Sequence, residues 1–211
     1  MTDRSTLLDA RSEDLLAAIR GLLQAKGVLT ADEVADRIRV TDNASPGQGA
    51  RMVAKAWLDP DYRARMLADG TQAAEEIGIP MRGMPPLGVL ENTAETHNLV
   101  VCTLCSCYPR AVLGYPPFWF KSASYRAQAV RDPRGMLERE FKTVVPDAVR
   151  LRVVDSTADY RWMVLPMRPA GTEGWSESQL AAIVREGDMI GDRKSTRLNS
   201  SHGYISYAVF C

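Results

Sequence analysis

Three cysteines lie within six residues of this 211-residue chain, at positions 102, 105 and 107, and the fold has to bring all three thiols to one point. Cys105 and Cys107 flank a single serine, so their sulfurs and the amide nitrogens of Ser106 and Cys107 can reach the same metal ion. These four donors can lie roughly in one plane around the ion. Cys102 can bind the ion from below that plane, which leaves one coordination position open. A metal ion with an open position can act as a Lewis acid toward water or a substrate.

The amide nitrogens restrict the choice of metal. An amide nitrogen binds only after losing its proton, which zinc rarely brings about near neutral pH, and zinc prefers a tetrahedral set of side-chain ligands. Thiolates are soft ligands, and a trivalent cobalt or iron ion suits a plane of two sulfurs and two nitrogens. The sequence therefore favours trivalent cobalt or iron over zinc.

A zinc knuckle is the alternative interpretation, because a Cys-x-x-Cys turn is most often a zinc or redox motif. A knuckle needs a fourth ligand, for which His97, His202 and Cys211 are the remaining candidates. His97 belongs to the apolar stretch 97–101, and we expect it to be a hydrogen-bonded structural histidine rather than a ligand.

Charge and hydropathy exclude several classes of function. The chain has 26 basic and 26 acidic residues and no basic block, so we expect no nucleic-acid binding. No apolar run approaches the roughly 20 residues of a membrane span, and the N-terminus lacks the apolar core of a signal peptide. With three of the four cysteines in one segment there is no disulfide framework, so we expect a cytoplasmic protein.

The first part of the chain, residues 1–80, is predicted to be a helical arm. A helix follows Ser12, a capping box formed by Thr30 and Glu33 opens a second, a third covers 47–58, and Pro60 begins a fourth. The first helix carries an apolar stripe at helical spacing with no obvious local core, which favours packing against a partner chain. Its members are Leu15, Leu16, Ile19, Leu22 and Leu23.

Residues 81–191 are predicted to form an α+β core that carries the cysteines. Strands are expected at 87–90 and 98–101, the second leading directly into Cys102. Further strands at 149–154 and 160–165 are expected to pair with each other through the turn 155–158. The remaining elements are helices at 124–130 and 133–141, and one that Ser176 and Gln179 cap and that runs through Val184.

Residues 192–211 depart abruptly from this pattern. Their sequence resembles a translated sequencing-adapter tail, and we expect them to be non-native. The alternative is a genuine C-terminal strand, because 204–210 has the composition of one.

The segment around the cysteines, VVCTLCSCYPRAVLGYPPFWFK at 100–121, resembles the metal-binding segment of the nitrile hydratase α subunit. The γ subunit of thiocyanate hydrolase belongs to the same family and is similar there. The resemblance extends over about residues 12–191, and it implies an extended N-terminal arm before a layered α-β-β-α core. The further matching segments are 53–60, 67–71, 91–93, 97–98, 125–126, 132–134 and 168–176.

The resemblance also implies a cofactor and a reaction. Within the family, a threonine after the first cysteine accompanies cobalt, so Thr103 indicates non-corrin cobalt(III), with iron(III) as the alternative. The implied ligands are Cys102, Cys105, Ser106 and Cys107. Cys105 is expected as a sulfinic acid and Cys107 as a sulfenic acid, and with Ser106 these are the expected catalytic residues for hydrating a nitrile to an amide. The sulfenate oxygen, or a water that it activates, would attack the nitrile carbon.

The implied partners are a β subunit, in an αβ or α2β2 assembly, a cobalt-delivering activator protein and a small nitrile substrate. The β subunit supplies two arginines to the oxidised sulfurs in this family. The active site is therefore expected at a subunit interface, and the chain alone is expected to be inactive.

Two residues that follow the cysteines in the sequence bear on which substrate the site would take. Arg110 stands where nitrile hydratases usually have tryptophan. It either favours an anionic substrate such as thiocyanate, or pairs with the sulfur oxygens or with a carboxylate of the partner. Trp119 is a candidate wall of the substrate pocket, or else a core residue. Three functions therefore stay open: a nitrile hydratase α subunit, a γ-like subunit of thiocyanate hydrolase, and a non-catalytic zinc-binding subunit.

Overall fold

The computed structural model describes the backbone of residues 4–193 and the side chains of residues 11–193. Contacts divide the chain into two units, one ending at Asn43 and the other beginning at Ala44. The boundary predicted at residue 80 lies inside the second unit. Of the predicted non-native tail, only residues 192 and 193 are described.

The first unit consists of two helices, α1 (Arg4–Ala25) and α2 (Ala31–Asn43). The predicted capping box is confirmed: the Glu33 amide donates to the Thr30 hydroxyl over 3.1 Å, and the Thr30 amide donates to the Glu33 carboxylate over 2.7 Å. Most of the apolar stripe of α1 is exposed, and Leu23 is half-buried. None of the helices within the described range is both long and apolar enough to cross a bilayer.

The second unit begins with three helices, α3 (Pro46–Leu58), α4 (Pro60–Ala68) and α5 (Gly70–Glu76). Pro60 occupies the first turn of α4, as predicted, where its missing N–H is not needed. Asp59 and Asp69 cap α4 and α5, because their side chains accept hydrogen bonds from the amides of Tyr62 and Gln72.

Four strands form two parallel pairs. β1 (Leu87–Glu91) pairs with β4 (Arg161–Leu165), and β2 (Thr96–Val101) pairs with β3 (Arg150–Asp155). The predicted pairing of β3 with β4 is therefore wrong, although both strands form.

Ser156 explains the difference. Its amide donates to the Val101 carbonyl over 2.7 Å, which extends the β2–β3 pair. Its hydroxyl accepts from the Trp162 amide over 3.1 Å, which starts β4 beside the other strand pair. The connection between β3 and β4 thus carries the chain from one pair to the other, so it is not a hairpin turn.

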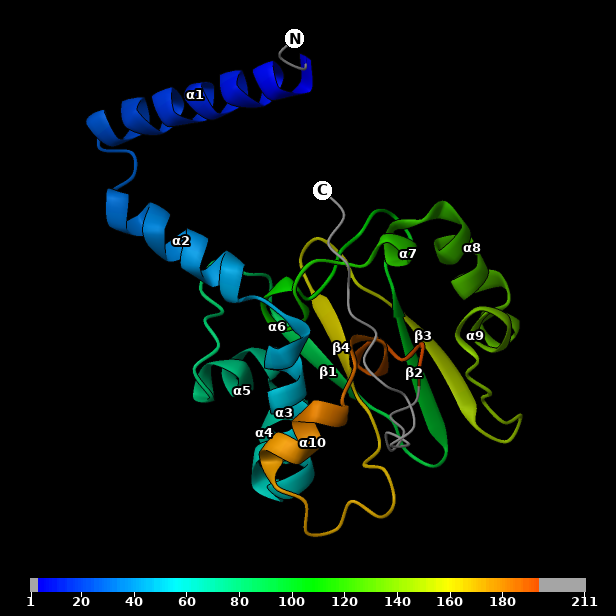
Figure 1. The fold of residues 1–211 in the computed structure, drawn as a ribbon. Coiled ribbons are helices and arrows are strands. Elements are labelled where there is room, and N and C mark those ends of the chain that lie inside the picture. The colour runs from blue at the N-terminus through cyan, green and yellow to red at the C-terminus, as the bar shows by residue number, and fades with distance from the viewer. Residues whose placement is uncertain (1–3, 194–211) are drawn as a thin grey trace. The chain divides into compact units, whose positions relative to one another are not determined.

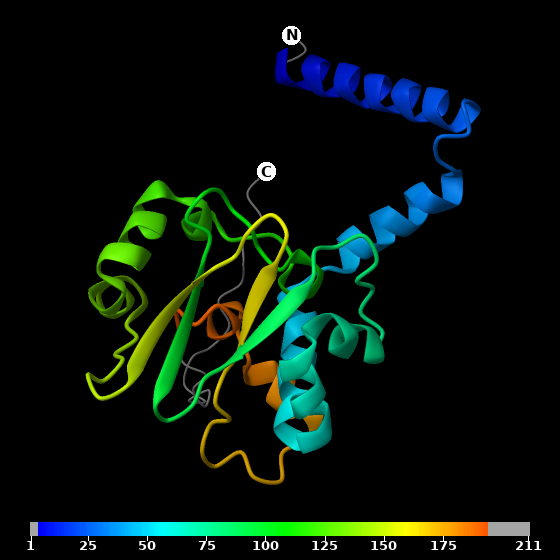
Figure 2. The same cartoon turned by 180° about the vertical axis from the view of Figure 1, so that it is seen from behind.

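Helices cover both strand pairs, which confirms the α+β class with helix layers outside (Figures 1 and 2). Helices α4 and α5 contact β1, and α10 packs along α3. On the other side, α8 contacts β2 and α9 contacts β3. The two strand pairs meet through β2, which contacts both β1 and β4. The remaining elements are α6 (Arg110–Leu113), α7 (Phe118–Lys121), α8 (Ala123–Arg131), α9 (Pro133–Phe141), α10 (Glu177–Ile183) and the 3-10 helix η1 (Glu186–Met189).

Gly191 lets the chain after η1 lie directly on β2. Its φ is +87°, and a Cβ at this position would lie 1.8 Å from the carbonyl oxygen of Asn98. We expect Gly191→Ala to destabilise the protein by about 3 kcal/mol or more, because backbone strain adds to a clash with strand backbone.

Gly78→Ala is the matched control. Gly78 has a similar φ of +79° but nothing within 4 Å of the added carbon. In thermal unfolding, Gly191→Ala should lower the Tm by several degrees more than Gly78→Ala does. Equal decreases in Tm would contradict the predicted clash with Asn98.

Candidate metal centre

The claw loop, residues 102–107, begins where two parallel strands end side by side. Val101 and Asp155 are the last residues of β2 and β3, and they are partners in the strand register. Because the carboxyl ends of parallel strands meet at the same edge, Asp155 lies next to the start of the claw loop.

The three thiols gather within this loop. Cys105 Sγ lies 3.6 Å from Cys102 Sγ and 3.3 Å from Cys107 Sγ, and all three sulfurs lie within 4.8 Å of one another. The Cys105 amide donates to Cys102 Sγ over 3.2 Å. Cys102 and Cys107 are buried, whereas Cys105 is exposed. The structure therefore brings the three predicted sulfurs together with one of them open to solvent.

Asp155 fastens the start of the loop to β3. Its carboxylate accepts a hydrogen bond from the Thr103 amide over 3.0 Å and another from the Thr103 hydroxyl. Charged acceptors make stronger bonds than neutral ones, so this pair holds the residue after Cys102 in place.

Arg126 fastens the middle of the loop from α8. Its Nη1 donates to the carbonyl oxygen of Cys105 over 2.8 Å and to that of Leu104 over 3.3 Å. The loop is thus held at its start and in its middle by charged side chains from other elements.

The free thiols differ in acidity. The pKa of the Cys105 thiol lies below its usual value, chiefly because Cys107 hydrogen-bonds to its sulfur. Burial, together with the two neighbouring sulfurs, raises the pKa of Cys107 to about 12. A bound metal cation would lower the pKa of the Cys107 thiol instead, because a coordinating thiol is deprotonated outright.

The donor set suits a metal ion held partly by the backbone. Within residues 11–193, the three cysteines are the one group of at least three close His, Cys, Asp or Glu side chains with metal-binding spacing. His97 is not part of it. Three thiols without a fourth side chain do not complete the four-ligand shell of a structural zinc site. Backbone nitrogens of the loop can supply what is missing.

Ser106 and Arg110 lie on either side of the last cysteine. Ser106 is partly buried in the claw loop between the two close sulfurs. Arg110 is exposed at the start of α6, and its guanidinium stacks over the ring of Tyr115 at 4.3 Å.

Trp119 lies on α7 and packs in an aromatic cluster. Its ring centroid lies 5.9 Å from that of Phe120, 5.0 Å from that of Tyr125 and 5.2 Å from that of Phe141. Its nearest ring, Tyr125, immediately precedes Arg126 in α8. These contacts match the core alternative for Trp119, and a wall of the substrate pocket remains a proposal.

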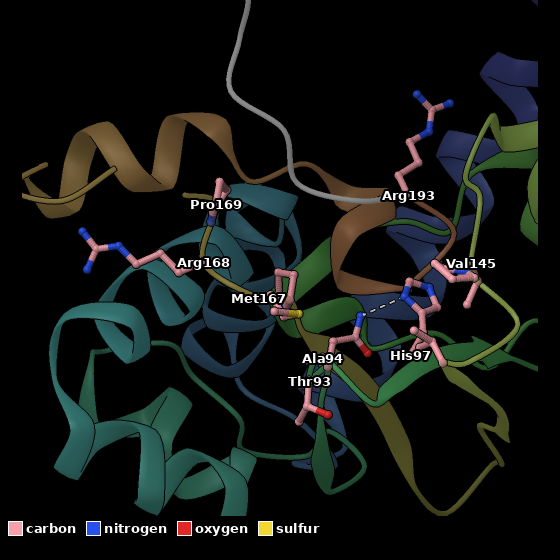
Figure 3. A pocket seen from close by; sticks show the side chains of 12 residues that line it. Thr93, Ala94, His97, Val145, Met167, Arg168, Pro169 and Arg193 are labelled. Atoms are coloured by element: carbon pink, nitrogen blue, oxygen red, sulfur yellow. Dashed lines mark hydrogen bonds between the residues drawn. The ribbon is translucent and has the colours of Figure 1, made fainter. Parts of the chain in front are cut away.

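A separate pocket of about 240 Å³ lies near the other end of β2 and contains His97 (Figure 3). His97 Nε2 is 2.6 Å from the Gly191 carbonyl oxygen and its Nδ1 is 3.5 Å from Asn92, which confirms the predicted buried, hydrogen-bonded histidine. The side chains of Arg168 and Arg193 extend away from His97 (Figure 3). His97 is five residues before Cys102, about 16 Å along a strand, so this pocket is distinct from the thiols.

The family model for the nitrile hydratase alpha chain matches residues 10–193. The chain belongs to this family. Its described part therefore corresponds almost wholly to a nitrile hydratase alpha chain.

Curated relatives include two kinds of nitrile hydratase family subunit. The cobalt-containing nitrile hydratase subunit alpha of Pseudonocardia thermophila is 46% identical over 175 residues, which cover 82% of this chain and 86% of the relative. The low-molecular weight cobalt-containing subunit alpha of Rhodococcus rhodochrous is 47% identical, with 82% and 84% covered. The thiocyanate hydrolase subunit gamma of Thiobacillus thioparus is 40% identical over 190 residues, with 85% and 78% covered.

Solved structures agree with this assignment. A double mutant of the Fe-type nitrile hydratase from Comamonas testosteroni Ni1 matches with a TM-score of 0.74 and 36% identity over the whole of both chains. A recombinant thiocyanate hydrolase with partially modified cobalt centres matches with a TM-score of 0.77 and 36% identity, covering 94% of this chain and 98% of that one. The nitrile hydratase alpha-chain fold therefore extends over the whole described chain.

Two residues at this candidate metal centre were not predicted from sequence. The sequence places Asp155 only in a turn, and Arg126 only in a predicted helix and in a segment that matches the family. Their contacts join residues 52 and 21 positions apart, so no local spacing marks them. A usable signal for Asp155 was its position directly after the predicted strand 149–154, as an acidic residue at a strand end.

Proposed function

We propose that this chain is the metal-binding α subunit of a cobalt nitrile hydratase, which hydrates nitriles to amides once it is assembled with a β subunit. The observation that carries the proposal is the gathering of three thiols within 4.8 Å at the end of β2. The 46% identity to a cobalt-containing α subunit over most of both chains supports the choice of metal and reaction.

The sulfurs of Cys102, Cys105 and Cys107 and the backbone nitrogens of Ser106 and Cys107 would hold the metal. A bound cobalt(III) ion, with iron(III) as the alternative, supplies Lewis acidity toward a nitrile or water. The chain's own contribution is to hold the loop rigid. Asp155 does this through Thr103, and removing a contact that holds the residues around a metal ligand typically changes metal affinity by about 10- to 100-fold.

The proposal includes oxidation of Cys105 to a sulfinic acid and of Cys107 to a sulfenic acid, with an external oxidant supplying the oxygen atoms. Oxidation of a thiolate depends on its exposure, and Cys105 is exposed whereas Cys107 is only 8% exposed. Cys102, at 1% exposed, would stay a thiolate. The Ser106 hydroxyl, between the two oxidised residues, would orient them by hydrogen bonding.

A β subunit would cover the claw loop. Large apolar side chains in the loop and in the segment that follows it are strongly exposed: Leu104 by 87%, Phe118 by 88% and Tyr115 by 62%. Apolar groups gathered on a surface commonly mark a protein contact. An αβ or α2β2 assembly and a cobalt-delivering activator protein belong to the same proposal. The exposed stripe of α1 would also contact a partner, which supports an arm function for the first part of the predicted 1–80 segment, before the 81–191 core.

A cytoplasmic location and a non-native tail at 192–211 complete the proposal. The three cysteines of the described part are free thiols, which is the usual state in reducing compartments. The family model ends at residue 193, which supports the exclusion of the tail.

Thiocyanate hydrolysis is the second candidate, because a small pocket beside Cys107 is lined by two cations. Arg110 and Arg161 line this pocket of about 60 Å³. Arg161 Nη1 is buried and has no hydrogen-bond partner in the described part of the chain. The rest of the lining contains no acidic group, so the pocket favours an anion such as thiocyanate. The remaining lining residues are Met81, Met84, Pro85, Leu87, Tyr108, Pro109, Ala111 and Val112.

The test is to purify the chain without residues 194–211 in complex with its β partner, from cells supplied with both cobalt and zinc. We expect about one cobalt per α chain and faster hydration of acetonitrile than of thiocyanate. Stoichiometric zinc without cobalt would instead support the non-catalytic zinc-binding alternative. Faster turnover of thiocyanate would support the second candidate. In that case Arg110→Gln should lower kcat/KM for thiocyanate by about tenfold, or ~1.4 kcal/mol, and leave that for acetonitrile unchanged.

A further inference from the structure

Arg126 contacts the backbone of the claw loop at one particular peptide group. Its Nη1 lies 2.8 Å from the carbonyl oxygen of Cys105, and the nitrogen of that same peptide group belongs to Ser106. The second contact, 3.3 Å to the Leu104 oxygen, fixes the direction of the guanidinium. Arg126 therefore touches the peptide whose nitrogen is a proposed metal ligand.

The start of α8 is built to hold Arg126 in this place. The Ser122 hydroxyl caps the helix by accepting from the Tyr125 amide over 3.1 Å. Tyr125 is buried, its ring lies 5.0 Å from that of Trp119, and its hydroxyl donates to the Val100 carbonyl on β2 over 3.4 Å. The residue before Arg126 is thus anchored both to the core and to the strand that delivers the cysteines.

The chemistry of an amide ligand gives this contact a purpose. The peptide bond is planar because the nitrogen lone pair is shared with the carbonyl oxygen. When the Ser106 nitrogen binds a metal as an amide anion, its proton leaves to solvent and part of the negative charge resides on the Cys105 oxygen. A guanidinium donates a stronger hydrogen bond to an anionic oxygen than to a neutral one.

We propose that Arg126 is a positioning residue for the metal. It orients the peptide group between Cys105 and Ser106 and stabilises the negative charge that metal binding by the Ser106 nitrogen places on the Cys105 oxygen. This inference rests on the amide ligation in the proposed function.

The test compares Arg126→Gln and Arg126→Lys with the wild type, each as the α chain in complex with its β partner. Arg131→Gln is the matched control, because Arg131 is exposed on the same helix. The first measurement is the cobalt concentration in the medium that gives half-maximal loading. X-ray absorption then counts the nitrogen and sulfur ligands of the loaded metal.

Arg126→Gln keeps N–H donors but removes the positive charge of the side chain. It therefore tests whether that charge stabilises the Cys105 oxygen, apart from hydrogen bonding and packing. We expect the half-maximal concentration to rise by about 10- to 100-fold, as for other partners of metal ligands, with fewer nitrogen ligands in the metal that is loaded. Arg126→Lys, which keeps the charge, should lie between Arg126→Gln and the wild type. Equal loading and equal ligand counts for Arg126→Gln and Arg131→Gln would overturn the inference.

A second measurement needs no variant and applies even if Arg126→Gln does not assemble. The side-chain N–H signals of Arg126 are compared by NMR in the metal-free and cobalt(III)-loaded wild-type complexes. A downfield shift on loading, absent for Arg131, is expected, and unchanged Arg126 signals would overturn the inference. If the wild type holds zinc through side chains alone, the proposed function fails. If it holds amide-bound cobalt regardless of Arg126, only this inference fails.

Discussion

Replacing Cys105 by serine is expected to leave a folded chain that no longer retains cobalt. Cys105 Sγ lies between the other two sulfurs, at 3.6 and 3.3 Å, so its loss removes the central soft ligand of the set. A serine hydroxyl stays protonated near neutral pH and is a poor ligand for a metal that selects thiolates. We expect cobalt content and nitrile hydration to fall by more than about 100-fold, beyond the usual effect of removing an outer partner.

The fold should survive this change, because Cys105 is exposed and its side chain contacts the other two thiols. Elemental analysis of the complex with the β subunit measures the bound metal. The Tm of the metal-free Cys105→Ser chain should differ from that of the metal-free wild type by no more than about 3 °C. Cys211→Ser in the full-length chain, outside the described residues, is the control and should keep full cobalt. Cobalt retained at wild-type stoichiometry by Cys105→Ser would contradict the claw assignment.

Replacing Ser106 by proline is expected to have an effect of similar size for a different reason. Proline has no backbone N–H, so position 106 can no longer provide an amide anion to a metal. The three sulfurs remain, and a site made only of side chains would keep its ligands. We therefore expect cobalt loading to fall by about 100-fold or more in the Ser106→Pro complex.

Ser106→Ala is the matched control, because it removes the hydroxyl and keeps the amide nitrogen. It should load cobalt at the wild-type stoichiometry while hydrating nitriles more slowly, if the hydroxyl orients the oxidised sulfurs as proposed. X-ray absorption of both complexes gives the number of nitrogen ligands. Equal cobalt loading of the proline and alanine variants would show that the Ser106 nitrogen is not a ligand. A folding defect is excluded if metal-free Ser106→Pro unfolds at the same temperature as the metal-free wild type.

The sequence predicted the elements of the core better than their pairing. All four strands form close to the predicted residues, because their apolar patterns and flanking turn residues are local signals. The pairing of β3 with β4 was wrong, because alternation shows which face of a strand is buried and does not name its neighbour. The choice between a hairpin and two separate parallel pairs rested on buried Ser156, which hydrogen-bonds to Val101 and Trp162 at once.

The observed contacts of the two predicted pocket residues, Arg110 and Trp119, are local in the sequence. Arg110 stacks on Tyr115, five residues away, and Trp119 packs against Tyr125, six residues away, so each contact falls within one short segment. In the proposed assembly, a β subunit would supply the rest of the surface around both residues.

By itself, the sequence determined the starts of several helices and predicted the donors of the proposed metal centre, because both depend on residues only a few positions apart. Three sulfurs and two amide nitrogens within six residues can chelate one ion, and Thr30, Pro60 and Ser176 each act on their own helix turn. Only the tertiary structure decided what holds those donors in place. Asp155 reaches Thr103 across 52 residues and Arg126 reaches Cys105 across 21, through the register of β2 with β3 and the packing of α8 on β2. Such contacts follow from which strands and helices become neighbours, and local residue spacing carries no information about that choice.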